Sequence, residues 1–147
     1  MNPVASSSLD ISHVIQLAIA PVFLLSSLGT ILGVLTTRLG RIVDRTRVLM
    51  ERREKGSPER RPRLEEELEM LMRRRRLVNL AIGAGTVAAL LVCLLIAVAF
   101  LGSLVEVPTG AALAALFVLA MVAYIGALVL FFREVLMSAG NTYVDFH

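Results

Sequence analysis

Three long stretches without a charged side chain constrain the fold of this chain more than any other feature. They cover residues 11–37, 77–105 and 107–132 and contain 27, 29 and 26 residues. The hydrocarbon core of a bilayer is about 30 Å thick, and about 20 residues of α-helix cross it. Inside lipid the backbone must satisfy its own hydrogen bonds, and three segments are too few for a closed barrel. The sequence therefore predicts an all-α integral membrane protein with three transmembrane helices.

The composition supports a membrane protein and argues against an enzyme. Hydrophobic residues make up 56% of the chain and the mean hydropathy is +0.76, whereas soluble domains contain about 45–50% apolar residues. The single cysteine, Cys93, lies within the second apolar run, so we expect neither a disulfide nor a zinc framework. His13 and His147 have no further ligands at metal-binding spacing. With no phosphate-binding loop and no nucleophile beside a base, we expect no catalytic residue, cofactor or metal.

The placement of the basic residues predicts the orientation of the chain. Of the 15 Lys and Arg residues, 14 lie within 38–76 and the last is Arg133. Basic segments stay on the cytoplasmic side of a membrane, which places the N-terminus outside and the C-terminus inside. The expected segments are an outer tail (1–10), transmembrane helix 1 (11–37), a cytoplasmic helical hairpin (38–76), transmembrane helix 2 (77–105), an outer turn (106–110), transmembrane helix 3 (111–132) and a cytoplasmic tail (133–147). This sidedness explains the high pI, so we expect no nucleic acid partner.

The first helix is expected to continue beyond the membrane. Apolar residues recur at three- and four-residue spacing after Thr37, which predicts one helix from about His13 to about Lys55. Pro21 should bend this helix, because proline removes a backbone hydrogen bond. The segment 56–58, Gly-Ser-Pro, then ends the helix and starts another. Two arms of similar length, each with an apolar stripe, indicate an antiparallel hairpin.

A stripe of small and hydroxyl residues follows one face of the first helix. At 100° per residue these side chains fall within a narrow sector. One interpretation is a packing face for close helix contacts. The other is that copies of this face surround an aqueous path in a homo-oligomer. The residues of this stripe are Ser26, Gly29, Thr30, Gly33 and Thr37.

Charged and polar residues border the membrane segments. Asp44 is the one acid among four arginines just beyond the first span, and we expect it to form a fixed ion pair within its own chain or with a neighbouring copy. A basic run before the second span should contact anionic lipid head groups, and Asn79 should find a polar partner on another helix, such as Thr36 or Thr37. The ion-pair group is Arg38, Arg41, Asp44, Arg45 and Arg47, and the lipid-contact group is Arg73, Arg74, Arg75 and Arg76.

Residues 21–47, PVFLLSSLGTILGVLTTRLGRIVDRTR, resemble an uncharacterised family of small bacterial membrane proteins known as a domain of unknown function. In that family a proline-containing first span with FLL and spaced glycines leads into a similar RLxRIVDRxR motif. The resemblance implies a location in the bacterial inner membrane and no established activity. The order of segments is also similar to that of the Oxa1-type insertases, an analogy of layout alone.

Two hypotheses for function follow from these features. The first is a homo-oligomer that conducts ions, or is otherwise related to permeation, along a path lined by transmembrane helix 1. The alternative is a non-conducting membrane scaffold or insertase-like helper that binds protein partners through the hairpin.

Overall fold

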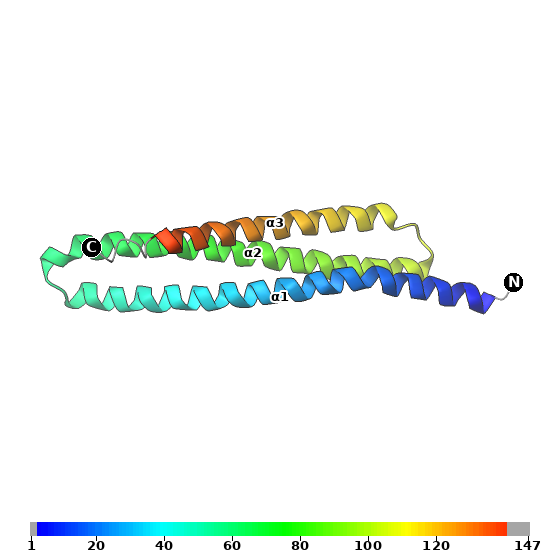
Figure 1. The fold of residues 1–147 in the computed structure, drawn as a ribbon, viewed down its shortest axis with the longest axis horizontal. Helices are drawn as coiled ribbons and strands as arrows, with labels where there is room; N and C mark the ends of the chain where they lie inside the picture. Colours follow the sequence, from blue (N-terminus) through cyan, green and yellow to red (C-terminus); the bar gives the residue numbers. More distant parts are fainter. Residues whose placement is uncertain (1–2, 141–147) are drawn as a thin grey trace. The chain divides into compact units, whose positions relative to one another are not determined.

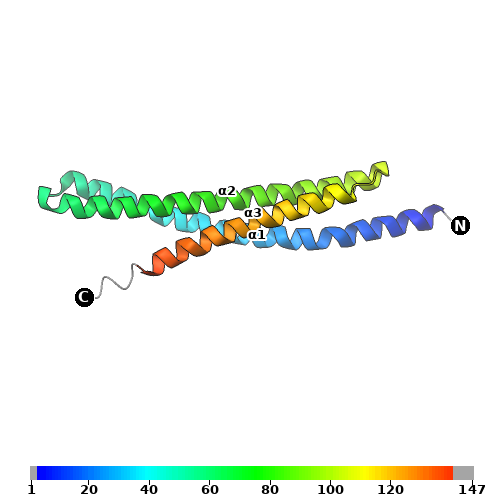
Figure 2. The same ribbon diagram turned by 90° about the horizontal axis from the view of Figure 1, so that it is seen from above.

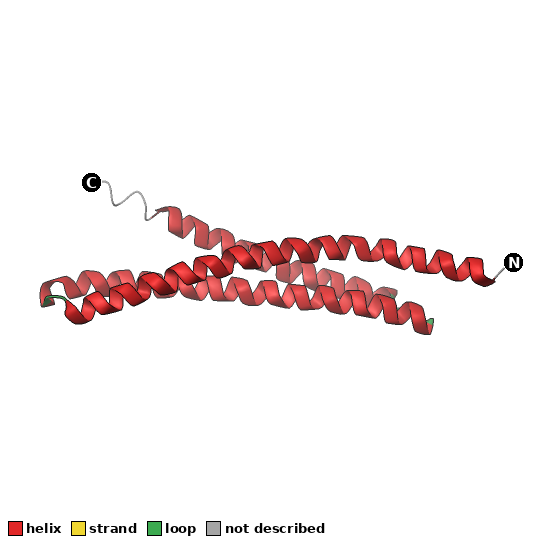
Figure 3. Cartoon of the chain, turned by 90° about the horizontal axis from the view of Figure 1, so that it is seen from below, coloured by secondary structure: helices red, strands yellow, loops and turns green. Residues whose placement is uncertain are grey.

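The computed structural model describes residues 3–140 of the chain as three long α-helices, with a short 3-10 helix, η1 (Pro58–Arg60), between the first two (Figure 1). The helices are α1 (Pro3–Lys55), α2 (Arg61–Val105) and α3 (Gly110–Gly140). Three helical segments are long and contain a part that is apolar enough to cross a membrane: Ile19–Lys55, Pro58–Val105, which includes η1, and Gly110–Ser138. Within the described residues only short connections interrupt the helices (Figure 3). The predicted all-helical fold with three candidate spans is confirmed.

The bounds of α1 agree with those predicted from the sequence at one end only. The helix runs without a break from the apolar run into the charged segment and ends at Lys55, as predicted. It begins at Pro3, earlier than the expected start near His13, and continues past Pro21. His147 lies outside the described residues, as does the side chain of His13.

Each helix buries residues that recur about every seven positions. In α1 these are Leu28, Leu35, Ile42 and Leu49, all at most 5% exposed. A seven-residue repeat keeps one side of a helix facing its neighbours. We call the buried residues on that side of each helix its seam. In α2 the seam includes Leu71, Val78, Ala81, Ala88, Val92 and Leu95, and in α3 it includes Ala120, Ala127 and Glu134.

The chain packs as two units, each built from segments of all three helices. Unit 1 comprises Met1–Ile31 and Gly85–Ile125. Its core joins Leu28 of α1, Ala88 and Val92 of α2, and Ala120 of α3. The small side chains on α2 and α3 allow the close approach that favours helix packing in lipid.

The turn between α2 and α3 closes unit 1. The Val107 N–H donates to the Gly102 carbonyl at 3.2 Å, and Glu106 has a φ of 55°. This is the pattern of a helix C-terminus capped by a left-handed residue, a position that usually holds glycine. A Cβ built on Gly102 would lie 2.5 Å from Cγ2 of Thr109, so the turn packs directly on the last part of α2.

Unit 2 comprises Leu32–Ala84 and Gly126–His147 and contains the predicted hairpin. The charged parts of α1 and α2 run side by side (Figures 1 and 2). Salt bridges join the arms at Arg45–Glu67 (2.6 Å) and Arg53–Glu65 (2.8 Å). At the connection, a Cβ on Gly56 would lie 2.7 Å from the carbonyl oxygen of Arg52, which explains why glycine ends this arm.

Candidate functional site

A buried carboxylate on α3 is the main polar feature of unit 2. The side chain of Glu134 is 1% exposed. It follows Ala120 and Ala127 at seven-residue steps, so the seam that buries two methyl groups also buries this carboxylate. An ionised group is costly to remove from water unless it is paired and hydrogen-bonded. The structure around Glu134 therefore has to supply cations.

Two arginines from two other helices supply this pairing. Nη1 of Arg38 on α1 donates to Oε2 of Glu134 at 2.6 Å. Nη2 of Arg74 on α2 donates to Oε1 at 2.9 Å, and also to Oγ of Ser138 at 2.8 Å. We call Arg38, Glu134 and Arg74 the charge cluster. It links α1, α2 and α3 within unit 2.

The helix seams explain why the arginines meet the carboxylate. Arg74 precedes Ala81 and Ala88 of the α2 seam by seven and fourteen residues, and its side chain is 20% exposed. Arg38 is 35% exposed, and its guanidinium lies over the ring of Phe131, 5.5 Å from the centroid. A cation above an aromatic face gains further electrostatic stabilisation. Both arginine side chains are therefore partly buried, and each guanidinium group is paired with Glu134.

Each charge in the cluster is stabilised by its oppositely charged partners. Removing one partner of a buried ion pair leaves the other charge uncompensated and costs about 3–5 kcal/mol. The planar guanidinium suits this role better than an ammonium group because it presents several donors in a rigid fork. The cluster can thus fix the mutual positions of the three helices within unit 2.

The stripe of α1 lies on the outside of the chain. All five of its members are exposed, and a Cβ on Gly29 or Gly33 would meet nothing within 4 Å. The hydroxyls donate to carbonyls of their own helix, from Ser26 to Val22 (3.2 Å), Thr30 to Ser26 (3.1 Å) and Thr37 to Gly33 (2.9 Å). The stripe is therefore available to a surface outside this chain.

The ion pairs predicted around the end of the first span have other partners than expected. Arg38 and Arg45 pair with Glu134 and Glu67, neither of which was singled out in the sequence. Asp44 is exposed and makes no salt bridge with the described residues of its own chain. Its pairing with a neighbouring copy stays a prediction. Arg41 and Arg47 are exposed.

The basic run of α2 divides into two groups. Arg73, Arg75 and Arg76 are exposed, whereas Arg74 belongs to the charge cluster. Asn79 is exposed, and Thr36 and Thr37 donate to Leu32 and Gly33 of their own helix. No hydrogen bond between Asn79 and either threonine is present among the described residues.

Glu134 was missed by the sequence analysis, although a signal for it exists. By its position it fell within the expected cytoplasmic tail (133–147). Extending Leu113, Ala120 and Ala127 by one further step of seven reaches Glu134. A charged residue at a seam position is the feature that would have identified it.

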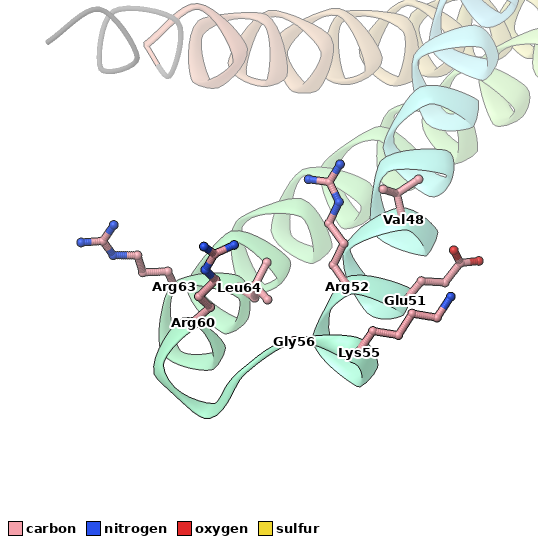
Figure 4. Close-up of a pocket in the computed structure, with 8 residues that line it drawn as sticks. All are labelled: Val48, Glu51, Arg52, Lys55, Gly56, Arg60, Arg63 and Leu64. Carbon is pink, nitrogen blue, oxygen red and sulfur yellow. The ribbon is translucent and has the colours of Figure 1, made fainter.

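A hollow of about 820 Å³ lies at the hairpin connection of unit 2 (Figure 4). Its side chains spread rather than converge: Arg63 extends to one side, and Glu51 and Lys55 extend to the other. The lining residues are Val48, Glu51, Arg52, Lys55, Gly56, Arg60, Arg63 and Leu64. Among the side chains that the structure describes, no group of three His, Cys, Asp or Glu is placed to hold a metal.

Comparison with known proteins places the chain in a family. The family model described as "Protein of unknown function (DUF2721)" matches residues 18–143, which include the 21–47 segment. No curated protein and no solved structure matches the chain. The expected kinship with an uncharacterised family is confirmed, and the layout analogy with Oxa1-type insertases stays a prediction.

Proposed function

Because the chain belongs to the DUF2721 family, whose function is unknown, we propose its function from the geometry of its helices. We propose a homo-oligomer of the bacterial inner membrane whose copies meet along the α1 stripe and let ions cross beside it. The hairpin lies in the cytoplasm and the α2–α3 turn lies outside, because the basic residues collect on the hairpin side. The protein binds lipids and further copies of itself, and we assign it no catalytic residue.

The outward position of the stripe carries this proposal. Glycines with open space beside them favour close approach of a second helix in lipid. From Ser26 to Thr37 the stripe spans about 16 Å at 1.5 Å per residue, about half of the roughly 30 Å hydrocarbon core. Each hydroxyl that donates to its own helix keeps lone pairs that an ion can use. Arg38, at the end of the stripe, is paired with Glu134.

Crosslinking tests the contact between copies. In a Cys93→Ala background, Gly33→Cys should form disulfide-linked dimers in native membranes. Val34→Cys is the matched control, because Val34 is exposed on α1 about 100° away from Gly33. Equal crosslinking at the two positions would contradict a contact along the stripe.

Ion flux into liposomes tests conduction. Purified protein should pass ions above the level of empty liposomes over a range of pH and voltage. Thr37→Val should change this flux, whereas Thr36→Val, an exposed threonine off the stripe, should leave it unchanged. Flux equal to that of empty liposomes would contradict conduction, and equal effects of both variants would contradict a path along the stripe.

A second candidate function rests on the hairpin. Val43 (41%) and Met50 (50%) are exposed seven residues apart, so they lie on one face of its α1 arm. Exposed apolar side chains outside a membrane mark interaction sites, and methionine adapts to varied partners. A non-conducting scaffold or insertase-like helper would use this surface. A photo-crosslinker at Met50 that captures only further copies of this chain would contradict the scaffold.

A further inference from the structure

A small hollow lies beside the charge cluster in unit 2. It measures about 240 Å³, below the roughly 300–1,000 Å³ of pockets for drug-sized ligands. It therefore suits one compact group rather than an extended molecule. Its polar lining consists of Arg38, Arg41, Arg45, Arg74, Glu134 and Ser138.

The lining carries excess positive charge. Arg38 and Arg74 share the one carboxylate of Glu134, and Arg45 pairs with Glu67. Arg41 is exposed and forms no salt bridge with any residue that the structure describes. Four guanidinium groups thus meet two carboxylates, Glu67 included. The hollow attracts an anion.

The lining is also short of hydrogen-bond acceptors. Nη2 of Arg74 donates to both Glu134 and Ser138, while its Nε is buried without a partner. Buried polar atoms nearly always have a partner, so an unpaired donor indicates an occupant or a rearrangement that supplies one. Arginine is the side chain that recognises the planar arrangement of oxygens in a phosphate or carboxylate.

The position of the hollow along the helices identifies the source of the anion. Arg38 directly follows the first uncharged run, Arg74 lies three residues before the second, and Glu134 lies two residues after the third. At 1.5 Å per residue these groups lie within about 5 Å of the ends of the apolar segments. The headgroup layer occupies about 5–7 Å on each side of the hydrocarbon core. The hollow is thus at the depth of lipid phosphates.

We propose that this hollow binds the phosphate of an anionic phospholipid headgroup, with Arg41 as its free cation and the charge cluster as its wall. The proposal goes beyond ion conduction and does not depend on it. It differs from general attraction of lipid by exposed arginines, because it requires a defined site that saturates.

A lipid titration of the full-length protein tests the site. The melting temperature is measured in a neutral detergent with increasing phosphatidylglycerol, with phosphatidylcholine as the neutral lipid and inorganic phosphate as the free anion. Phosphatidylglycerol should raise the melting temperature to a plateau, and the other two should not. If inorganic phosphate at equal concentration also raised the melting temperature to a plateau, the anion would not have to come from a lipid. If the two lipids raised the melting temperature equally, the hollow would not recognise an anion.

Two matched variants separate the site from the surface. Arg41→Gln should weaken the apparent affinity for phosphatidylglycerol about tenfold or more, the effect of losing one hydrogen bond to a charged group. Arg47→Gln removes an exposed arginine of the same helix that does not line the hollow, and should leave the affinity unchanged within about twofold. Neither residue pairs with a described carboxylate, so both variants should fold. Equal losses of affinity for phosphatidylglycerol in the two variants would contradict a defined site at the hollow.

Discussion

Glu134 shows how a single side chain can link three helices within unit 2. Its carboxylate is bound by Arg38 at 2.6 Å and by Arg74 at 2.9 Å. In a seam otherwise lined by alanine, this charge is stable only while both arginines remain. The cluster therefore favours this packing of the helices, because a packing that buried Glu134 away from the arginines would leave an unpaired charge.

Neutralising this carboxylate should destabilise the protein strongly. Glu134→Gln keeps the shape of the side chain and leaves two guanidinium groups without a counter-charge. We expect a loss of about 3 kcal/mol in the free energy of unfolding, measured as a lower melting temperature in detergent. Glu69→Gln is the control, because Glu69 is an exposed glutamate on α2. Equal melting temperatures for the two variants would contradict the role of the cluster.

The exposed salt bridges of the hairpin should behave differently. Arg53 and Glu65 are joined at 2.8 Å, but their side chains are 52% and 53% exposed. Water and salt screen such pairs, so Glu65→Gln should cost less than about 1 kcal/mol. The same unfolding assay measures this difference. A loss of stability as large as that of Glu134→Gln would show that burial does not determine which ion pair contributes more to stability.

At the scale of the helices, the turn between α2 and α3 depends on Gly102. Gly102→Ala should destabilise by about 1–3 kcal/mol because its Cβ would overlap the side chain of Thr109. Gly126→Ala, where a Cβ meets nothing within 4 Å, is the control. Adding Thr109→Ala should recover part of the loss at Gly102 in a double-variant cycle of thermal unfolding. No recovery would show that Thr109 is not the obstacle.

The helices and their breaks were predictable from the sequence, while the faces they bury were less so. Uncharged length predicts a membrane helix, and 56–58 predicts the hairpin connection, because both signals are local. In lipid the exposed face is as apolar as the buried one, so hydropathy does not separate Leu28, which is buried, from Phe23, which is exposed. For the same reason the outward direction of the α1 stripe did not follow from its composition.

Glu134 shows a second limit of prediction from sequence. The pairing of Arg38 with a carboxylate 96 residues away depends on how three helices pack. Charge at the end of an apolar run is common, and it usually indicates the membrane surface. The seven-residue step from Ala127 to Glu134 was the available signal, and it becomes meaningful once the seam is known.

At the scale of the whole molecule, the proposals share one premise: three helices cross the membrane, with the hairpin inside the cell and the α2–α3 turn outside. The roles given to the stripe, the charge cluster and the phosphate site all depend on this orientation. The chain contains one cysteine, Cys93, so single reporter thiols can be placed in a Cys93→Ala background.

Labelling of Ser57→Cys and Ser103→Cys with a membrane-impermeant maleimide in intact bacterial cells tests this premise most directly. Ser57 lies at the hairpin connection and Ser103 near the α2–α3 turn, and both are exposed. Ser103→Cys should react in intact cells, and Ser57→Cys should react only after the cells are permeabilised. Labelling of Ser57→Cys in intact cells would contradict this premise.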